Sequence, residues 1–411
     1  MLPDPGIPVG GTKGASVHVA ELTRAYVRAG HEVLLVAMRT AGPAPEGVDL
    51  QILDPGPLPQ GPEHDHERIA ATEWFFEEAV ASVRDFAPDL VHERLSAFAG
   101  GGPHFAAVLG VRRLVEVNAP VIAERASRLR VADLDTAEGL ERAALADARA
   151  VAVSAPLAGW ARERGAAAVA VVPNGVDVDR FAPDAVASAV VRASLGLAGA
   201  DVVGFIGSLK PWHGVDVLLD AAATLAARRP RLHVLVVGDG PERPSLEVRA
   251  TRRLEGRVHF VGAVPAAAIP AYLAAFDVAA APYRAPATAV DFYFSPLKVV
   301  EAMAAARPVV ASRFAPIEDL LAGHGSLVPP GDVPALAAAI DAALDDPDAA
   351  ARATAGRQHA VRAHGWDAVV RQTLSAAFDP VGATQTVGAR ATAVPAGDQP
   401  GGLAAATGVA A

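Results

Sequence analysis

A serine, a proline, a lysine and a glutamate stand close together in FYFSPLKVVEAMAAARPVVAS, residues 292–312. Ser295 suits a helix N-cap because its hydroxyl can accept an unpaired backbone N–H, and Pro296 suits the first helical position. Lys298 is unusual there, since a cation in the first turn opposes the helix dipole. Free N–H groups, the dipole and a lysine together predict a phosphate site. Glu301, one turn later on the same face, either pairs with Lys298 or accepts hydrogen bonds from sugar hydroxyls.

Three further loops combine glycine or a cation with the end of a predicted element. In GFIGSLKPWHGVDVLLDA, residues 204–221, a strand ends at Gly207 and Lys210 follows in the loop. The alternative reading of Lys210 is a solvated loop lysine. VVGDGPE, residues 236–242, is a second loop after a strand, and GGTKGAS, residues 10–16, is its counterpart in the first half. Such loops meet at the carboxyl edge of a parallel sheet, so the set predicts a cleft between two domains.

Other stretches that could carry chemistry are weaker. The triplet Asp177-Val178-Asp179 lies in a turn after a strand, and His64 and His66 lie in a loop rich in proline and glycine, so we expect neither group to bind a metal. GGTKGAS is not a P-loop, because its lysine precedes the glycine instead of following it, and no G-x-G-x-x-G follows a strand. We therefore expect no metal and no other cofactor.

The elements that position these residues alternate between short β-branched runs and helical stretches rich in Ala and Leu. This pattern predicts an α/β fold of two doubly wound, Rossmann-like domains with parallel sheets. In the second half it predicts strands at Val202–Ile206, Leu232–Val237, Val258–Val261, Val278–Ala281 and Pro308–Ala311. The intervening helices are predicted at Val215–Ala227, Ala266–Ala275, Ser295–Ala306 and Val333–Leu344.

The first half shows the same alternation of strands and helices, but the strand expected before its first helix is not predicted. Helices are predicted at Ala15–Ala29 and Glu73–Phe86, and strands at Glu32–Ala37, Leu90–His92, Arg113–Val117 and Ala150–Ser154. A helix that opens after a Gly-rich turn should follow a buried strand, but only MLPDPGIPV precedes it, and prolines argue against a central strand. Either the sheet lacks its first strand or the start codon has been placed too far downstream, and we favour the second explanation.

We predict domain boundaries from composition and turn signals. Residues 1–172 form the first domain and residues 173–364 the second, with the junction near Val172-Pro173-Asn174-Gly175. Residues 365–379 form a closing helix, and residues 380–411 form a disordered tail without periodic hydrophobic positions.

Composition narrows the class of protein. The chain has 411 residues, 52% of them hydrophobic, a net charge of −10 and no cysteine. The acidic balance argues against a nucleic-acid partner, and the lack of cysteine rules out disulfides and thiolate metal sites. No apolar run is long enough for a membrane span and no signal peptide is evident. We expect a cytoplasmic protein, with peripheral contact at the inner face of a membrane left open.

Taken in order, these stretches resemble glycosyltransferase family 4, a group of retaining enzymes with the GT-B fold that use nucleotide-sugars. The resemblance runs from Gly10 to about Phe378 and rests on GGTKGASVHVAELTRAYVRAGHEV, VEVNAPVIAE, VVPNGVD, GSLKPWHGVDVLLDA, VVGDGP and FYFSPLKVVEAMAAARPVVAS. A subgroup with GSLKPWHG and SPLK looks similar. The resemblance implies that the C-terminal domain binds the donor, the N-terminal domain binds a carbohydrate or lipid-linked acceptor, and no metal is needed.

The resemblance also assigns roles to residues. Those expected to act in catalysis are Lys210, Lys298, Glu301 and Asn118. Those expected to bind the donor are Gly207, Ser208, Lys210, Gly238, Asp291, Tyr293, Ser295, Pro296, Leu297, Lys298 and Glu301. The N-terminal cleft loop contributes Gly11, Lys13, Gly14 and Ser16, and the acceptor side contributes Glu116, Asn118 and Glu124.

The chain departs from the family pattern in three respects. Of the usual pair of glutamates only Glu301 is present, because the first would fall at Tyr293, with Asp291 as a possible substitute. At the positions of the arginine and the lysine that usually bind the diphosphate, this chain has Ser208 and His213. Asn118 stands where many members have a histidine.

The expected reaction is transfer of a hexose to a hydroxyl acceptor with retention, in polysaccharide or glycoconjugate biosynthesis. Two alternatives stay open: a nucleotide-sugar epimerase of the same fold, and a non-catalytic partner subunit that has kept the fold. The sugar, the base, the acceptor and the oligomeric state are not fixed by the sequence.

Overall fold

The computed structural model describes residues 1–379 except 12, 60, 286–292 and 294. The chain divides into two compact units, Met1–Asp379 and Pro380–Ala411. The predicted tail and Asp291 lie outside the described residues, and all described residues belong to the first unit.

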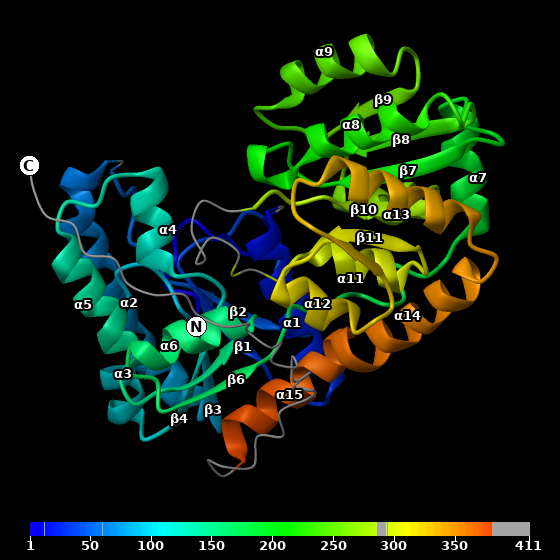
Figure 1. Cartoon of the computed structure of the whole chain (residues 1–411). Coiled ribbons are helices and arrows are strands. Elements are labelled where there is room, and N and C mark those ends of the chain that lie inside the picture. Colours follow the sequence, from blue (N-terminus) through cyan, green and yellow to red (C-terminus); the bar gives the residue numbers. More distant parts are fainter. Residues whose placement is uncertain (12, 60, 286–292, 294, 380–411) are drawn as a thin grey trace, which may run out of the picture. The chain divides into compact units, whose positions relative to one another are not determined.

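The second half is built on one parallel sheet of six strands in the order β12-β11-β10-β7-β8-β9 (Figure 1). Its strands are β7 (Asp201–Ile206), β8 (Leu232–Val237), β9 (Val258–Gly262), β10 (Val278–Ala281), β11 (Val309–Ser312) and β12 (Ser326–Val328). Its helices are α7 (Ala185–Ser194), α8 (Val215–Leu225), α9 (Arg243–Arg253), α10 (Ile269–Ala274), α11 (Leu297–Ala304), α12 (Ala315–Leu321), α13 (Val333–Asp345) and α14 (Ala349–His364). Short 3-10 turns are η2 (Pro211–His213) and η3 (Ala266–Ala268).

Strands of this sheet are apolar on both faces. β8 reads LHVLVV and all but His233 are buried, which is typical of a strand covered by helices on both sides. β7 pairs with β8 from Asp201↔Leu232 to Ile206↔Val237, and β10 pairs with β7 on its other edge. The chain therefore winds outward from β7 to β9, then returns to the middle and winds outward again from β10 to β12. Ligands of doubly wound sheets bind at such a reversal, beyond the carboxyl ends of β7 and β10.

The first half contains two parallel sheets, β1-β2 and β3-β4-β5-β6. The strands are β1 (Leu34–Ala37), β2 (Asp49–Ile52), β3 (Leu90–Arg94), β4 (Arg112–Val117), β5 (Arg149–Ala152) and β6 (Ala168–Val171). The helices are α1 (Gly14–Arg28), α2 (Asp65–Phe86), α3 (Gly102–Leu109), α4 (Val121–Arg128), α5 (Leu134–Leu145) and α6 (Ala155–Glu163), with one 3-10 turn, η1 (Pro62–His64).

The last helix, α15 (Trp366–Phe378), returns to the first half and packs beside α1 (Figure 1). Trp366, Val369 and Val370 share an apolar cluster with Leu22 and Tyr26 of α1. The closing helix predicted for residues 365–379 is therefore present as Trp366–Phe378, and it covers the first half.

The predicted α/β class with parallel sheets is confirmed, but several predicted bounds were wrong. α2 begins at Asp65, eight positions before the predicted Glu73, because its first turns are mixed in polarity and hide the helical period. The predicted helix Ala266–Ala275 is a 3-10 turn followed by the short α10, with Pro270 in its first turn. The predicted strand Ala150–Ser154 ends at Ala152, and Ser154 instead caps α6.

Candidate functional site

The helix α11 begins close to where the sequence predicted, but its start is built differently. Its first residue is Leu297, its N-cap is Pro296, and among the described residues no side chain makes a capping hydrogen bond to it. The prediction of Ser295 as the N-cap was therefore wrong. The Ser295 hydroxyl accepts the backbone N–H of Asn174 at 3.2 Å, and the Asn174 side-chain amide donates to the Ser295 carbonyl at 3.3 Å. The helix start thus leaves its first N–H groups without a side-chain cap and is held in place by Asn174.

Lys298 places its ammonium group against two aromatic rings. Its Nζ lies 4.1 Å from the centre of the Phe205 ring and 5.1 Å from that of Tyr283. The residue is half-buried, but the Nζ atom is buried and has no hydrogen-bond partner among the described residues. Burial lowers the pKa of Lys298 to about 7, and the nearby charge of Glu301 acts in the opposite direction. A buried cation with no hydrogen bond is costly, so this group is prepared for an anion.

The glycine at the end of β7 makes room for this lysine. Gly207 has φ of +142°, and a Cβ there would lie 2.8 Å from the Nζ of Lys298. Gly238, at the end of β8, has φ of +134°, and a Cβ there would lie 2.0 Å from the Gly207 carbonyl oxygen. The Leu209 N–H donates to the Asp239 carbonyl at 2.9 Å. The two predicted loops therefore meet at the carboxyl edge of the sheet, as expected.

Two polar residues of the loop after β7, His213 and Lys210, have distinct environments. The imidazole of His213 contacts Ser208 through Nδ1, and burial, followed by the charges of Lys298 and Lys210, lowers its pKa to about 4. His213 is therefore neutral at pH 7. Lys210 holds its ammonium 4.9 Å from the centre of the Trp212 ring, and Trp212 is 43% exposed. Lys210 thus extends the positive charge of the site from the interior to the surface.

Glu301 lies one turn after Lys298 and is half-buried. Burial raises the pKa of Glu301 to about 7, while the charges of Arg180 and Lys298 act to lower it. Arg180 also lies 3.6 Å from the carboxylate of Glu21, a buried residue of α1. Sequence reasoning missed Arg180, because it comes from the connection after β6 and reaches the site only through the fold.

Tyr293, which was predicted to contact the donor, lies against the first half of the molecule. It packs against the apolar cluster of the first half that contains Leu95 and Leu157, and the Ser154 hydroxyl donates to its carbonyl oxygen. Together with the Asn174–Ser295 contacts, this fixes the chain just before α11 to residues that follow β5 and β6. Ser154 and Asn174 were not predicted. An Asn or Ser after a strand is too common a turn signal to single them out.

The predicted residues of the first half fall into two groups, and Glu116 forms the first. Glu116 is buried, and both of its oxygens are engaged: His18 Nε2 lies 2.6 Å from Oε1, and Arg94 donates to Oε2 at 3.3 Å. Burial alone would raise the pKa of Glu116, but His18 and Arg94 outweigh it and hold that pKa well below its usual range. Glu116 therefore belongs to an internal ion-pair network, and its predicted role on the acceptor side stays a prediction.

The second group lies outside this network. Asn118, after β4, is half-buried and its Nδ2 has no partner among the described residues. Ser16 is buried with its Oγ unpaired in the described part of the chain, and a Cβ at Gly11 would lie 2.7 Å from it. Lys13 is the exposed N-cap of α1, which begins at Gly14, and Glu124 lies in the first turn of α4. Asn118 and Ser16 thus keep polar atoms that a ligand could engage.

Solved structures match this fold over most of the chain. Anabaena Alr3699/HepE in complex with UDP has a TM-score of 0.68 at 21% identity, covering 90% of this chain and 97% of that one. Sucrose-phosphate synthase from Thermosynechococcus elongatus has a TM-score of 0.67 at 24% identity, covering 91% and 96%. The fold is thus that of the GT-B glycosyltransferases.

Two family models then divide the chain between them. "Glycosyltransferase Family 4" matches residues 12–180, and "Glycosyl transferases group 1" matches residues 200–346. The first half of the chain is therefore similar to one glycosyltransferase family model and the second half to another, in keeping with the predicted resemblance.

Curated relatives are named glycosyltransferases. The GDP-mannose-dependent alpha-(1-6)-phosphatidylinositol monomannoside mannosyltransferase of Mycolicibacterium smegmatis is 37% identical over 204 residues, covering 49% of this chain and 53% of the relative. The 2-deoxystreptamine glucosyltransferase of Streptomyces kanamyceticus is 36% identical over 197 residues, covering 46% and 48%. The chain thus spans about half the length of the curated relatives it matches.

Proposed function

We propose that this protein transfers a hexose from a nucleoside diphosphate sugar to a hydroxyl acceptor, with retention at the anomeric carbon. The observation that carries the proposal is the buried ammonium of Lys298, unpaired among the described residues, at the uncapped start of α11. It lies beside Gly207, at the reversal point of the second sheet, where an anionic ligand supplies the missing partner. The matched families and the named relatives support the same class of reaction.

In this proposal the diphosphate is the leaving group, and its negative charge grows in the transition state. Lys298 and the first N–H groups of α11 are fixed donors aimed at that charge, and such preorganised donors stabilise the transition state more than the ground state. Lys210 adds a second cation in the loop after β7. Glu301 accepts hydrogen bonds from the sugar hydroxyls of the nucleotide, and Arg180 keeps its carboxylate ionised when the donor is bound.

The backbone of six further residues completes the proposed donor site: Gly207, Ser208, Gly238, Ser295, Pro296 and Leu297. A leaving phosphate oxygen takes the proton of the acceptor hydroxyl on the same face, so no protein base is assigned. As part of the proposal we assign the chain to the subgroup with GSLKPWHG and SPLK, on the resemblance of these two motifs. The prediction that the reaction needs no metal stays a prediction.

On the acceptor side we propose Asn118, Glu124 and the loop of residues 11–16. Asn118 and Ser16 support this assignment through their unpaired polar atoms in the described part of the chain. The acceptor we infer is a carbohydrate or a lipid-linked glycan, consistent with the lipid-linked acceptor in the name of one relative. No helix among the described residues is long and apolar enough to cross a bilayer. A lipid-linked acceptor would bring the protein to the inner face of a membrane as a peripheral partner.

The experiment is a donor screen on the full chain. Purified protein is incubated with GDP-mannose, UDP-glucose and other nucleotide-sugars in the presence of a mixed acceptor pool. Release of nucleoside diphosphate is measured, and the anomeric configuration of the product is read by NMR. We expect release with one donor and an α-linked product from an α-linked donor. If the protein shows no release of nucleoside diphosphate and no nucleotide binding, the proposal that it is an enzyme is refuted. Interconversion of the sugar without transfer would favour an epimerase.

A further inference from the structure

The chain passes between the two halves twice, and the two passages lie side by side. The first is the connection after β6, and the second joins α14 to α15. The Val176 N–H donates to the His364 carbonyl at 2.8 Å, and a Cβ at Gly175 would lie 2.5 Å from the Trp366 ring. The connection after β6 is therefore held in one place, and with it the backbone that carries Arg180.

Arg357 of α14 joins this connection to α11. Its guanidinium donates to the carbonyl of Phe181 at 3.3 Å and also to that of Ala304, the last residue of α11. The Phe181 side chain is buried in an apolar cluster that it shares with Ala304. Ala304 follows Glu301 by three positions, so these contacts bring Arg180 to the part of α11 where its charge acts on Glu301.

The Arg180 guanidinium is near carboxylates but is not fully engaged by them. Its Nη1 atom lies 3.6 Å from the carboxylate of Glu21 on α1, and its Nε atom lies 4.0 Å from that of Asp177. Both distances are too long for a hydrogen bond. The Nε atom is buried and has no hydrogen-bond partner among the described residues. The guanidinium therefore keeps donor groups and charge for a further acceptor.

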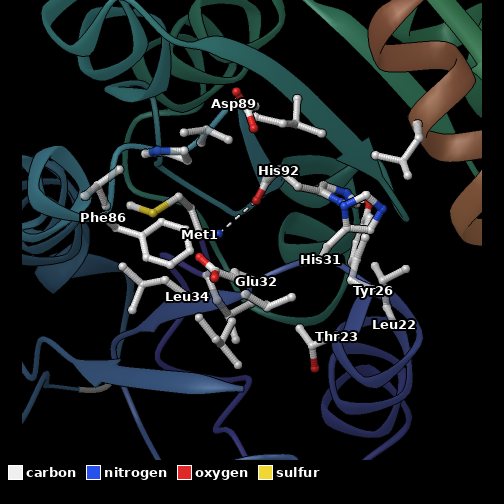
Figure 2. Close-up of a pocket in the computed structure, with 18 of the residues that line it drawn as sticks. Met1, Leu22, Thr23, Tyr26, His31, Glu32, Leu34, Phe86, Asp89 and His92 are labelled. Carbon is white, nitrogen blue, oxygen red and sulfur yellow. Dashed lines mark hydrogen bonds between the residues drawn. The ribbon is translucent and has the colours of Figure 1, made fainter. Parts of the chain in front are cut away.

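Glu21 is a buried residue of α1 that does not face the interior of the first half. Figure 2 shows Leu22 and Tyr26 of the same helix at a cavity of about 570 Å³, which β1 and β3 also line. Glu21 does not belong to that lining. Its Oε1 atom instead accepts an N–H of Arg24 at 3.0 Å and lies beside Arg180. The carboxylate of α1 thus meets the connection after β6.

Two cations act on Glu301, and Arg180 is the stronger of them. Burial raises the pKa of Glu301 to about 7, and of the charges that oppose this rise Arg180 comes before Lys298. Tyr283, after β10, also faces Glu301, because burial and then the charge of Glu301 raise the pKa of Tyr283. A residue from the connection between the halves therefore influences Glu301 more than the lysine one turn away on the same helix.

The other elements packed against α11 add no charge that acts on Glu301 among the described residues. β10 and β11 carry no titratable side chain. Arg357 of α14 donates to backbone carbonyls, and on α12 Glu318 pairs with Arg313 at 2.8 Å and lies near Asp319. The balance at Glu301 is thus set by Lys298 and Arg180.

We propose that Arg180 and Glu21 are positioning residues for Glu301: the Arg180 guanidinium is shared between the carboxylate of Glu21 in the first half and that of Glu301 in the second, so that the first half sets the charge of Glu301. Removing Arg180 favours the protonated form of Glu301. Removing the charge of Glu21 leaves more of the Arg180 charge to Glu301 and favours its carboxylate. The effect on donor binding rests on the proposed function, in which Glu301 binds the donor as a carboxylate, whereas the charge link itself does not.

The test follows the charge of Glu301 in the full chain without ligand. Glutamate side chains are labelled with ¹³C, the Glu301 signal is identified by its loss in Glu301→Gln, and its titration is followed by NMR. Arg180→Met should raise the titration midpoint by about one pH unit, and Glu21→Gln should lower it by about half a pH unit. Opposite directions identify a shared cation, because a pair that only holds the structure together would give the same direction from either side.

Two variants serve as matched controls. Arg180→Lys keeps the positive charge and should bring the midpoint most of the way back from its value in Arg180→Met. Arg24 pairs with the same oxygen of Glu21 from a side chain that is 44% exposed, so Arg24→Met should leave the midpoint of Glu301 nearly unchanged. Glu21→Gln keeps the shape of the side chain and an oxygen that accepts the Arg24 N–H, so a thermal melt should show that this variant folds.

Affinity for the nucleotide-sugar found in the donor screen is measured on the same variants at pH 7. With half of Glu301 ionised at this pH, affinity should fall about fivefold in Arg180→Met and rise about 1.5-fold in Glu21→Gln. Midpoint shifts in the same direction, or no shift in Glu21→Gln, would overturn the proposal, and Glu21→Gln decides this alone if Arg180→Met does not fold. Opposite shifts in a protein that binds no nucleotide-sugar would refute the proposed function and leave the charge link in place.

Discussion

The two halves of this molecule treat buried charge in opposite ways. In the first half Glu116 lies between His18 and Arg94, and Glu93 pairs with Arg113 at 2.7 Å, so buried carboxylates have partners within the protein. In the second half the Lys298 ammonium lies against the Phe205 and Tyr283 rings without donating a hydrogen bond to any described residue. The two halves therefore differ: the buried charge of Glu116 has partners within the protein, whereas the buried charge of Lys298 has no hydrogen-bond partner among the described residues.

This difference separates structural from functional charge. Removing one member of a satisfied buried pair leaves the other uncompensated and costs stability. Removing a buried charge that has no partner relieves a desolvation cost and deprives only the ligand. Substitutions at Glu116 and Lys298 should therefore move different measurements.

The largest effect is expected from Lys298→Met. Methionine keeps the unbranched shape but cannot donate to an anion, so the affinity for the nucleotide-sugar should fall by about 100-fold or more. The thermal midpoint should not fall, since the buried cation is removed. Calorimetric titration and a thermal melt on the same sample measure both. Lys210→Met is the matched control, and we expect a smaller loss because Lys210 is close to the surface. Normal affinity in Lys298→Met would refute the assignment of the site.

The converse substitution is Glu116→Gln. An amide cannot neutralise His18 and Arg94, so the free energy of unfolding should drop by about 2–4 kcal/mol at pH 7. Urea denaturation followed by circular dichroism measures it. The affinity for the nucleotide-sugar should stay within about twofold, since Glu116 belongs to the other half. Loss of affinity with unchanged stability would mean that Glu116 serves a ligand after all.

Local sequence patterns account for part of this arrangement. The meeting of Gly207, Gly238 and Lys298 was predictable, because the carboxyl ends of parallel strands share one edge and helix starts gather there. For each of these three positions a short stretch of sequence was sufficient.

The remainder depends on contacts that have no local signal. Phe205 reads as an ordinary core position of β7, and only packing reveals that its ring faces an ammonium group. Arg180 reaches Glu301 from the connection after β6, and Asn174 reaches Ser295 across 121 positions in the chain. The packing of Tyr293 against the first half was missed for the same reason, because a family pattern gives a position in the sequence and not a direction of the side chain.

A smaller effect is expected from pH. Burial holds the pKa of Lys298 at about 7 in the free protein, and binding an anion requires the protonated form. Affinity should therefore be highest below pH 7 and fall by up to about tenfold per pH unit above it. Glu301, with its pKa raised to about 7, acts in the opposite direction, because the proposed donor-bound form holds its carboxylate ionised, so it makes this fall less steep. Titration with the intact nucleotide-sugar between pH 6.5 and about 8.5 avoids ionisation of a terminal phosphate, whose pKa is about 6.

Lys298→Met supplies the control for this pH dependence. Without the ammonium group the residual affinity should change little with pH, and the small slope that stays reports Glu301. His213, with its pKa lowered to about 4, stays neutral throughout and contributes nothing. An unsubstituted protein whose affinity is flat from pH 6.5 to about 8.5 would show that Lys298 is already charged in the free state.

The smallest effect is expected where the two halves are joined. Asn174→Ala removes the side-chain hydrogen bond to the Ser295 carbonyl and loosens the start of α11 without touching a ligand. At about 1 kcal/mol for such a contact, KM for the donor should rise by about fivefold with kcat nearly unchanged, as steady-state kinetics would measure. Ser295→Ala removes the other bond, which the backbone N–H of Asn174 donates to the Ser295 hydroxyl.

The double variant tests whether the two bonds act as one unit. Both bonds join the same two residues, so losing either one weakens the other, and the double variant should be less impaired than the product of the two single effects. Independent effects would mean that Asn174 does not position Ser295, and that the start of α11 is held by the second half alone.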